Sequence, residues 1–240
     1  MQNKLFRLSM VAALAGFLFG FDTVVISGAD QKLQTLWQST DFFHGTVVMG
    51  MALWGTVIGA LFGGWPTQRI GRKKTLFWIG ILYSVSAVGS ALAQDPVSFA
   101  VFRFLGGLGI GASTIAAPAY ISEIAPAKDR GRLVGFYQFM IVFGILIAFL
   151  SNYLLEGIGP NDWRWMMGVE AFPALAYTAM VFFVPMSPRW LVSKDRVDEA
   201  KSVLQILGSD LSIDDLVKDH AQSQSVQGLS ESVLDKKYRF

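Results

Sequence analysis

The stretch VSFAVFRFLGGLGIGASTIAAPAYI, residues 97–121, decides how this chain must fold. It is long enough to cross a hydrocarbon layer of about 30 Å, which takes about 20 helical residues. Arg103 is its single charged residue. A charge inside a membrane span is costly and is kept mainly where it pairs with other polar groups or has a function. The stretch therefore predicts a membrane-spanning helix with a working arginine.

The composition of the whole chain also favours a membrane protein. Of its 240 residues, 52% are hydrophobic and only 16% are charged. The net charge of +2 gives no indication of a nucleic-acid partner. The chain has no cysteine, so the redox compartment stays undetermined.

Five further stretches have the length and composition of transmembrane helices. We place the six spans at 8–29, 45–66, 75–94, 97–121, 133–155 and 163–185. Long apolar runs of this kind exclude the alternating strands of a barrel. The predicted fold is all-α and integral to the membrane, with a six-helix bundle over 1–190 and short cytoplasmic linker helices over 191–240. A signal peptide is an alternative for the first stretch, but that stretch is long and Asp22 interrupts it.

The basic residues of the short loops predict how the chain is oriented. Those on one side of the membrane are Lys4, Arg7, Arg69, Arg72, Lys73, Lys74, Lys128, Arg130 and Arg132, whereas the opposite loops contain Lys32 alone. Positive loops remain in the cytoplasm. We therefore expect the N-terminus and residues 186–240 to be cytoplasmic, in a plasma or inner membrane.

Three charged residues lie inside three different spans, at nearly the same depth. Counting 1.5 Å per residue places Asp22, Arg103 and Glu170 each about 10 Å from the outer end of its helix. Two carboxylates that share one arginine can bind and release a proton. The alternative is a static ion pair that only fixes the helices. Asp22 is the expected titrating member.

A second group of charges lies at the cytoplasmic helix ends, where Arg69, Arg72, Arg130 and Arg132 surround Glu123. The arginines could serve only as topology signals. An acid contributes nothing to topology, so bridges to Glu123 could clamp these ends together and open during a conformational change. Both interpretations are consistent with the sequence.

Some remaining features favour packing over chemistry. Gly107-Leu108-Gly109-Ile110-Gly111-Ala112 matches a dinucleotide fingerprint, but it lies mid-membrane without a preceding strand, so we assign it to close helix packing. Gln138 could bond a hydroxylated ligand or a neighbouring helix. Phe19 lies nearly one turn before Asp22 and could cover the same cavity or only pack.

Together, the motifs resemble those of the N-terminal half of a sugar porter of the major facilitator superfamily. They are GFLFGFDTVVISG at 16–28, RIGRKK at 69–74, RFLGGLGIG at 103–111, PAYISEIAPAKDRGRL at 118–133, WRWM at 163–166 and PMSPRWL at 185–191. Their order and spacing run through residues 10–208.

The resemblance implies a role for each candidate residue. Asp22 would accept the coupling proton, with Arg103 and Glu170 as its partners. Phe19 and Gln138 would contact the sugar, and Ile145 occupies a position where some proton-coupled members have a second glutamine. The cytoplasmic charge network that stabilises the outward-facing state would include Arg69, Arg72, Glu123, Arg130 and Arg189.

Two departures from the family pattern weaken that network. Gln68 replaces an acid before RIGRKK, and Met186 replaces the usual acid in the PMSPR segment.

The resemblance predicts a monosaccharide–proton symporter that works by alternating access. A passive facilitator, a polyol porter and a non-transporting sugar sensor are the alternatives. An enzyme is not expected, and neither a cofactor nor a metal site is indicated. The expected partners are the sugar, protons, the lipid bilayer and a second, C-terminal six-helix half, which this sequence does not contain.

Overall fold

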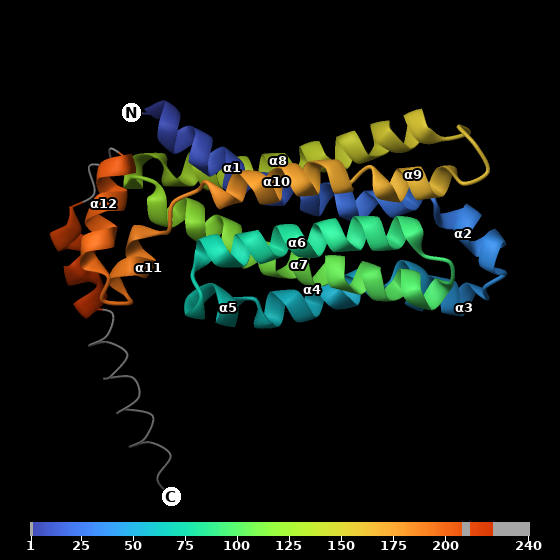
Figure 1. Ribbon diagram of the computed structural model, residues 1–240, viewed down its shortest axis with the longest axis horizontal. Coiled ribbons are helices and arrows are strands. Elements are labelled where there is room, and N and C mark those ends of the chain that lie inside the picture. Colours follow the sequence, from blue (N-terminus) through green and yellow to red (C-terminus); the bar gives the residue numbers. More distant parts are fainter. Residues whose placement is uncertain (1, 208–211, 223–240) are drawn as a thin grey trace, which may run out of the picture.

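The computed structural model describes residues 2–207 and 212–222 as an elongated bundle of helices (Figure 1). The helices are α1 (Gln2–Val25), α2 (Asp30–Trp37), α3 (Asp41–Phe43), α4 (Met51–Phe62), α5 (Gly64–Arg69), α6 (Arg72–Leu92), α7 (Pro96–Ile124), α8 (Ala127–Leu155), α9 (Asp162–Gly168), α10 (Ala171–Phe182), α11 (Pro188–Val192) and α12 (Val197–Leu207). Residues 213–222 are also helical.

Six segments of the described chain are long and apolar enough to cross a membrane. They are Lys4–Gly28, Asp41–Phe62, Arg72–Leu92, Pro96–Ile124, Ala127–Leu155 and Asp162–Phe182. The prediction of an all-α bundle with six spans is confirmed. The N-terminus, α5, α11 and α12 lie at one end of the bundle, here called the basic end, and α2 and α3 lie at the other, here called the far end (Figure 1).

Two of the six spans are not regular helices. The second span contains a π-helical segment at His44–Met49, between α3 and α4. The sixth is interrupted between α9 and α10, at Val169 and Glu170. Pro173 explains that interruption, because it has no N–H to donate to the carbonyl of Val169 and its ring crowds the preceding turn. Sequence analysis placed both spans but not these breaks.

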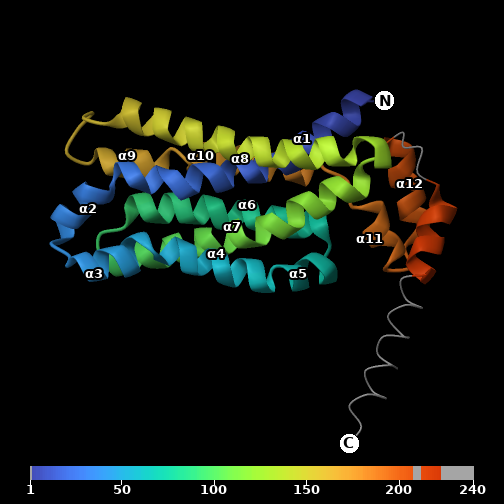
Figure 2. The same cartoon turned by 180° about the vertical axis from the view of Figure 1, so that it is seen from behind.

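The central helix of the bundle is α7. It packs most extensively on α4 and α6, and it also contacts α1, while α1 in turn packs along α8. Seen from behind, α8 and α4 run along opposite edges of the bundle (Figure 2). The most buried groups on α7 and α1 therefore lie between other helices rather than against lipid.

Glycines set the distance between the closest helices. A Cβ added at Gly107 of α7 would collide with the carbonyl of Ala52 in α4, and one at Gly144 of α8 would collide with the carbonyl of Phe17 in α1. Without Cβ atoms the backbones approach closely, which is how helices associate in lipid. The assignment of the Gly107-to-Ala112 segment to packing agrees with this contact.

Residues after the spans form a small separate core at the basic end. Trp190, Leu191 and Val192 of α11 pack with Ala200 and Leu204 of α12, and Leu216 joins them. The predicted boundary between a bundle at 1–190 and a linker at 191–240 stays a prediction. The expected helix stop at Gly208 and residues 223–240 of that linker lie outside the described residues.

We expect Gly107→Ala to lower the free energy of unfolding by about 1–3 kcal/mol, because the new methyl group pushes α4 away from α7. Thermal unfolding of the detergent-solubilised protein measures the change. Gly135→Ala is the matched control, since Gly135 is an exposed helical glycine whose added Cβ meets no atom within 4 Å. Equal melting temperatures for the two variants would contradict the packing role of Gly107.

Candidate functional site

A buried ion pair joins α1 to α7 in the middle of the bundle. Arg103 donates from Nη1 to Oδ1 of Asp22, and its Nη2 donates to the backbone carbonyl of Asp22 at 2.9 Å. Arg103 is 1% exposed and Asp22 is 0% exposed. Removing two charges from solvent is costly, and only their mutual attraction and hydrogen bonds offset that cost.

Glu170 is the third member of this charged site. It is 0% exposed and interacts electrostatically with both Asp22 and Arg103. Neither of its carboxyl oxygens has a hydrogen-bond partner among the described residues. The structure thus brings together the three charges that the sequence placed at one depth, with the arginine bound to Asp22 rather than to Glu170.

Local backbone features position these three side chains. The break caused by Pro173 puts Glu170 at the N-cap of α10, where the positive end of the helix dipole favours a carboxylate. Gly106 of α7 lets Ser86 of α6 come close beside Asp22, because an added Cβ would collide with Ser86 Oγ. Arg103 projects from the central helix α7, where it can interact with Asp22 of α1 and with Glu170 at the start of α10.

The arrangement supports exchange of one arginine between two acids. Asp22 Oδ2 and Arg103 Nε also have no partner within the part of the chain that the structure describes. Hydrogen-bonding capacity is therefore left over on all three groups. A site of this kind can change partners when a proton neutralises one carboxylate.

The three predicted sugar-contacting residues lie on two adjacent helices. Phe19 on α1 and Ile145 on α8 are half-buried, and Gln138 on α8 is exposed. A Cβ at Gly20, next to Phe19, would lie 3.0 Å from the backbone nitrogen of Ile145. Phe19 and Ile145 are thus at a similar height, and Gln138 is two turns from Ile145 towards the basic end.

Only one of the four arginines expected around Glu123 reaches it in the described structure. Arg72 donates from Nε to Glu123 Oε1 at 2.9 Å, and its Nη2 lies 2.8 Å from the same oxygen. Arg69 instead lies over the ring of Trp65, 4.9 Å from its centroid. Arg130 Nε is buried without a partner among the described residues. The larger clamp suggested by the sequence is therefore a single bridge in this conformation.

Arg189 contributes to a different contact at the basic end. It pairs at 3.2 Å with Asp219 of the linker. Its neighbour Trp190 donates from Nε1 to the carbonyl of Gln68 at 2.8 Å, and its ring packs on Gly71, whose φ is +92°. Through Trp190, α11 is thus attached to the end of α5 and to the turn that follows it, beside Gln68, which is one of the two departures from the family's charged network.

Sequence analysis overlooked two groups of polar residues. Buried hydroxyls of four spans gather near the charged site, and the recurrence of Tyr83, Ser86 and Ser90 on one face of α6 could have indicated them. At the far end, His44 is buried and bonds Asp30 at 2.7 Å. No local pattern in the sequence pointed to that pair.

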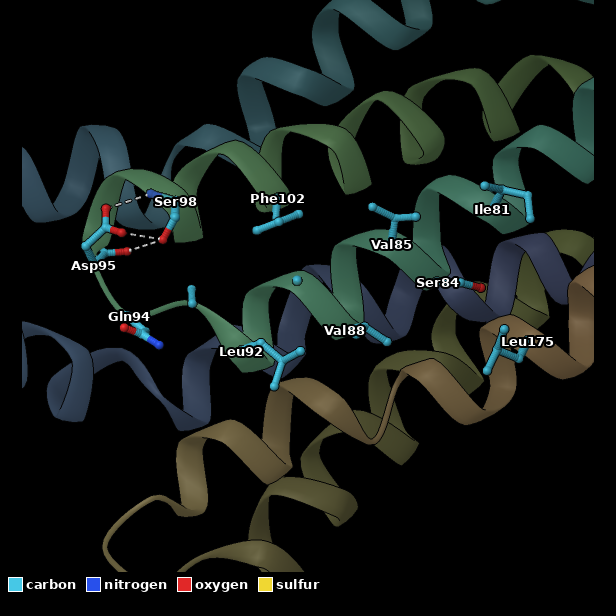
Figure 3. A pocket seen from close by; sticks show the side chains of 12 residues that line it. Ile81, Ser84, Val85, Val88, Leu92, Gln94, Asp95, Ser98, Phe102 and Leu175 are labelled. Atoms are coloured by element: carbon cyan, nitrogen blue, oxygen red, sulfur yellow. Dashed lines mark hydrogen bonds between the residues drawn. The ribbon is translucent and has the colours of Figure 1, made fainter.

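A groove of about 780 Å³ lies elsewhere, between α6, α7 and α10 (Figure 3). Its walls include Val88, Leu92 and Phe102, and Ser98 bonds Asp95 at one end. The hydrogen bonds from Ser98 hold the pKa of Asp95, the N-cap of α7, below its usual value. Val88 and Leu92 are exposed. The groove therefore opens on the side of the bundle and contains none of the predicted site residues.

Comparison with known proteins identifies the family. The family described as "Sugar (and other) transporter" matches residues 8–237. A glucose transport protein of Synechocystis is 42% identical over 85% of this chain and 46% of its own length. The D-xylose-proton symporter of Escherichia coli is 35% identical over 88% of this chain and 49% of its own length. The chain spans about half the length of the curated relatives it matches.

The fold comparison agrees. A solved structure of the proton:xylose symporter XylE, a major facilitator protein, superposes with a TM-score of 0.88 at 30% identity, over 95% of this chain and 55% of that one. Its relatives are transporters and not enzymes. With its six apolar spans and its match over residues 8–237, the chain is an integral membrane protein that belongs to the sugar (and other) transporter family of the major facilitator superfamily.

Proposed function

We propose that this chain forms half of a transporter that carries a monosaccharide into the cell together with a proton. The observation that carries the proposal is the Arg103–Asp22 ion pair with the unpaired Glu170 beside it, all three at most 1% exposed within six spans. Relatives named as symporters of protons with D-xylose, arabinose and galactose support the substrate class.

In the proposed cycle, Arg103 changes partner when Asp22 takes up a proton. The attraction between Arg103 and Asp22 lasts while Asp22 is charged. Protonation removes that attraction, and Glu170, at the N-cap of α10, then competes for the arginine. The exchange shifts α1 relative to α10 and couples proton binding to the movement that exposes the sugar to the other side.

The remaining assignments follow from the positions of charge and polarity. The basic end is placed in the cytoplasm because positive loops are retained there. Phe19, Gln138 and Ile145 form one wall of the sugar site, since they lie along the adjacent α1 and α8. A second six-helix half supplies the opposite wall, as in transporters that hold substrate between repeats.

We expect Asp22→Asn to abolish accumulation of sugar against its gradient and to leave exchange at equal concentrations largely intact. An amide cannot carry the proton, but it leaves the size of the side chain unchanged. Uptake of radiolabelled D-xylose into proteoliposomes, with the complete gene product and an imposed pH gradient, measures both activities.

Asp41→Asn is the matched control, because Asp41 is an exposed acid at the far end whose loss should leave both activities unchanged. Undiminished accumulation by Asp22→Asn would contradict proton symport through this residue. It would instead favour the passive facilitator.

The bridge between Arg72 and Glu123 is proposed to hold the cytoplasmic ends of α6 and α7 together in the outward-facing state. We expect Glu123→Gln and Arg72→Gln each to slow exchange, and the double variant that carries both substitutions to slow it little more than either one alone. A coupling energy of about 1 kcal/mol between the sites is the expected result of the double-mutant cycle.

Exchange rates of the four proteins give that coupling. Arg132→Gln serves as the control, because Arg132 is an exposed arginine in the same region as the bridge. Purely additive effects of the two single substitutions would mean that the bridge does not act as a unit.

A further inference from the structure

Four buried hydroxyl groups come together beside the charged site, one from each of four spans. Tyr83 of α6 and Ser113 of α7 are 0% exposed, and Tyr137 of α8 and Tyr177 of α10 are 1% exposed. None of them is used in the proposed exchange of Arg103 between its two acids. Their positions between helices also keep them away from lipid.

The group of hydroxyls is continuous with the charged site. Tyr83 interacts electrostatically with both Asp22 and Glu170, and it also interacts with Ser113 and Tyr137. The Ser113 and Tyr137 hydroxyls lie 3.3 Å apart, within hydrogen-bond distance. These interactions connect the hydroxyls in one series from the acids through Tyr83 and Ser113 to Tyr137.

This series leads from the charged site towards the basic end. The ring of Tyr137 lies 3.0 Å from the position that a Cβ would take at Gly16 of α1. Gly16 precedes Asp22 by six residues, so it is about 9 Å nearer the basic end. Tyr177 also lies nearer the basic end than Tyr83 does. Its ring is 3.0 Å from the position that a Cβ would take at Gly80, and Gly80 is almost one turn closer to that end along α6. The hydroxyls therefore bridge part of the protein between the acids and the proposed cytoplasmic side.

Structural stabilisation accounts for the Ser113 hydroxyl, which also donates to the carbonyl of Ile110 at 2.7 Å in its own helix, but not for two of the tyrosines. The hydroxyls of Tyr83 and Tyr177 have no hydrogen-bond partner among the described residues. An unpartnered buried hydroxyl costs stability, and phenylalanine would fill the same space without that cost. A hydroxyl with free bonding capacity can, however, accept one proton and donate another.

We propose that Tyr83, Ser113 and Tyr137 form a relay that passes the coupled proton from the acids towards the cytoplasm. The inference rests on the proposed symport. The acid releases its proton to the Tyr83 oxygen as Tyr83 passes its own proton to Ser113, and Ser113 passes its own to Tyr137. Tyr137 then releases a proton to water on the cytoplasmic side. Each hydroxyl gains one proton and loses one, so no net charge remains on the relay.

The test compares proton movement with sugar exchange in proteoliposomes that contain the complete gene product. The variants are Tyr83→Phe, Tyr137→Phe and Ser113→Ala, and a pH-sensitive dye in the lumen reports protons that enter with D-xylose. We expect each variant to slow sugar-driven proton entry about tenfold or more, within the range of general acid–base contributions. Exchange at equal pH and equal sugar should stay within about twofold of wild type.

Tyr120→Phe is the control for loss of a buried hydroxyl, because Tyr120 donates to the carbonyl of Pro185 outside the relay at 3.0 Å. It should leave the ratio of proton entry to exchange unchanged. The relay is overturned if the variants lose both activities in parallel, as a structural role predicts, or keep proton entry at the wild-type rate. Absence of sugar-driven proton entry in the wild type would instead overturn the proposed symport itself.

Discussion

The pairing of Arg103 with Asp22 is the interaction on which the rest of the structure depends. The centre of a bilayer offers no water to solvate a charge, so each ionised group must find its partner within the protein. That requirement draws α1 against α7 and leaves Glu170, which has no hydrogen-bond partner among the described residues, beside the pair. The proposed exchange of Arg103 depends on the same scarcity of partners, because one added proton would change which pairing has the lowest free energy.

Close packing supports this site by holding its helices at fixed distances. Glycines on α7 and α8 let the backbones of α4 and α1 come near enough that larger residues would collide. Pro173 has the opposite effect on the sixth span, since it interrupts the helix and brings Glu170 to the start of α10. Rigid contacts on one side of the site and a helix break on the other suit a mechanism in which α10 moves relative to α1.

The basic end shows how a weakened charge network can be reinforced by neutral contacts. Arg72 and Glu123 supply one ion pair there. Where the chain has Gln68 and Met186 in place of acids, the indole of Trp190 bonds the carbonyl of Gln68 and its ring packs on Gly71. Two constraints favour glycine at position 71. Its positive φ disfavours residues with a side chain, and a Cβ would lie 3.0 Å from the indole ring of Trp190. Trp190 thereby joins α11 to α5 and to the turn before α6 without a buried charge.

The sequence by itself determined the six spans, because length and hydropathy decide which helices cross a bilayer, and it placed Asp22, Arg103 and Glu170 at one depth by counting residues. It did not determine which carboxylate holds the arginine or which arginine reaches Glu123, since those choices depend on side-chain distances between helices far apart in the chain. The hydroxyls of Tyr83, Ser113 and Tyr137 show the difference most clearly. Each is an ordinary residue in its own span, and only the tertiary structure, by packing α6, α7 and α8 together, brings the three into one series.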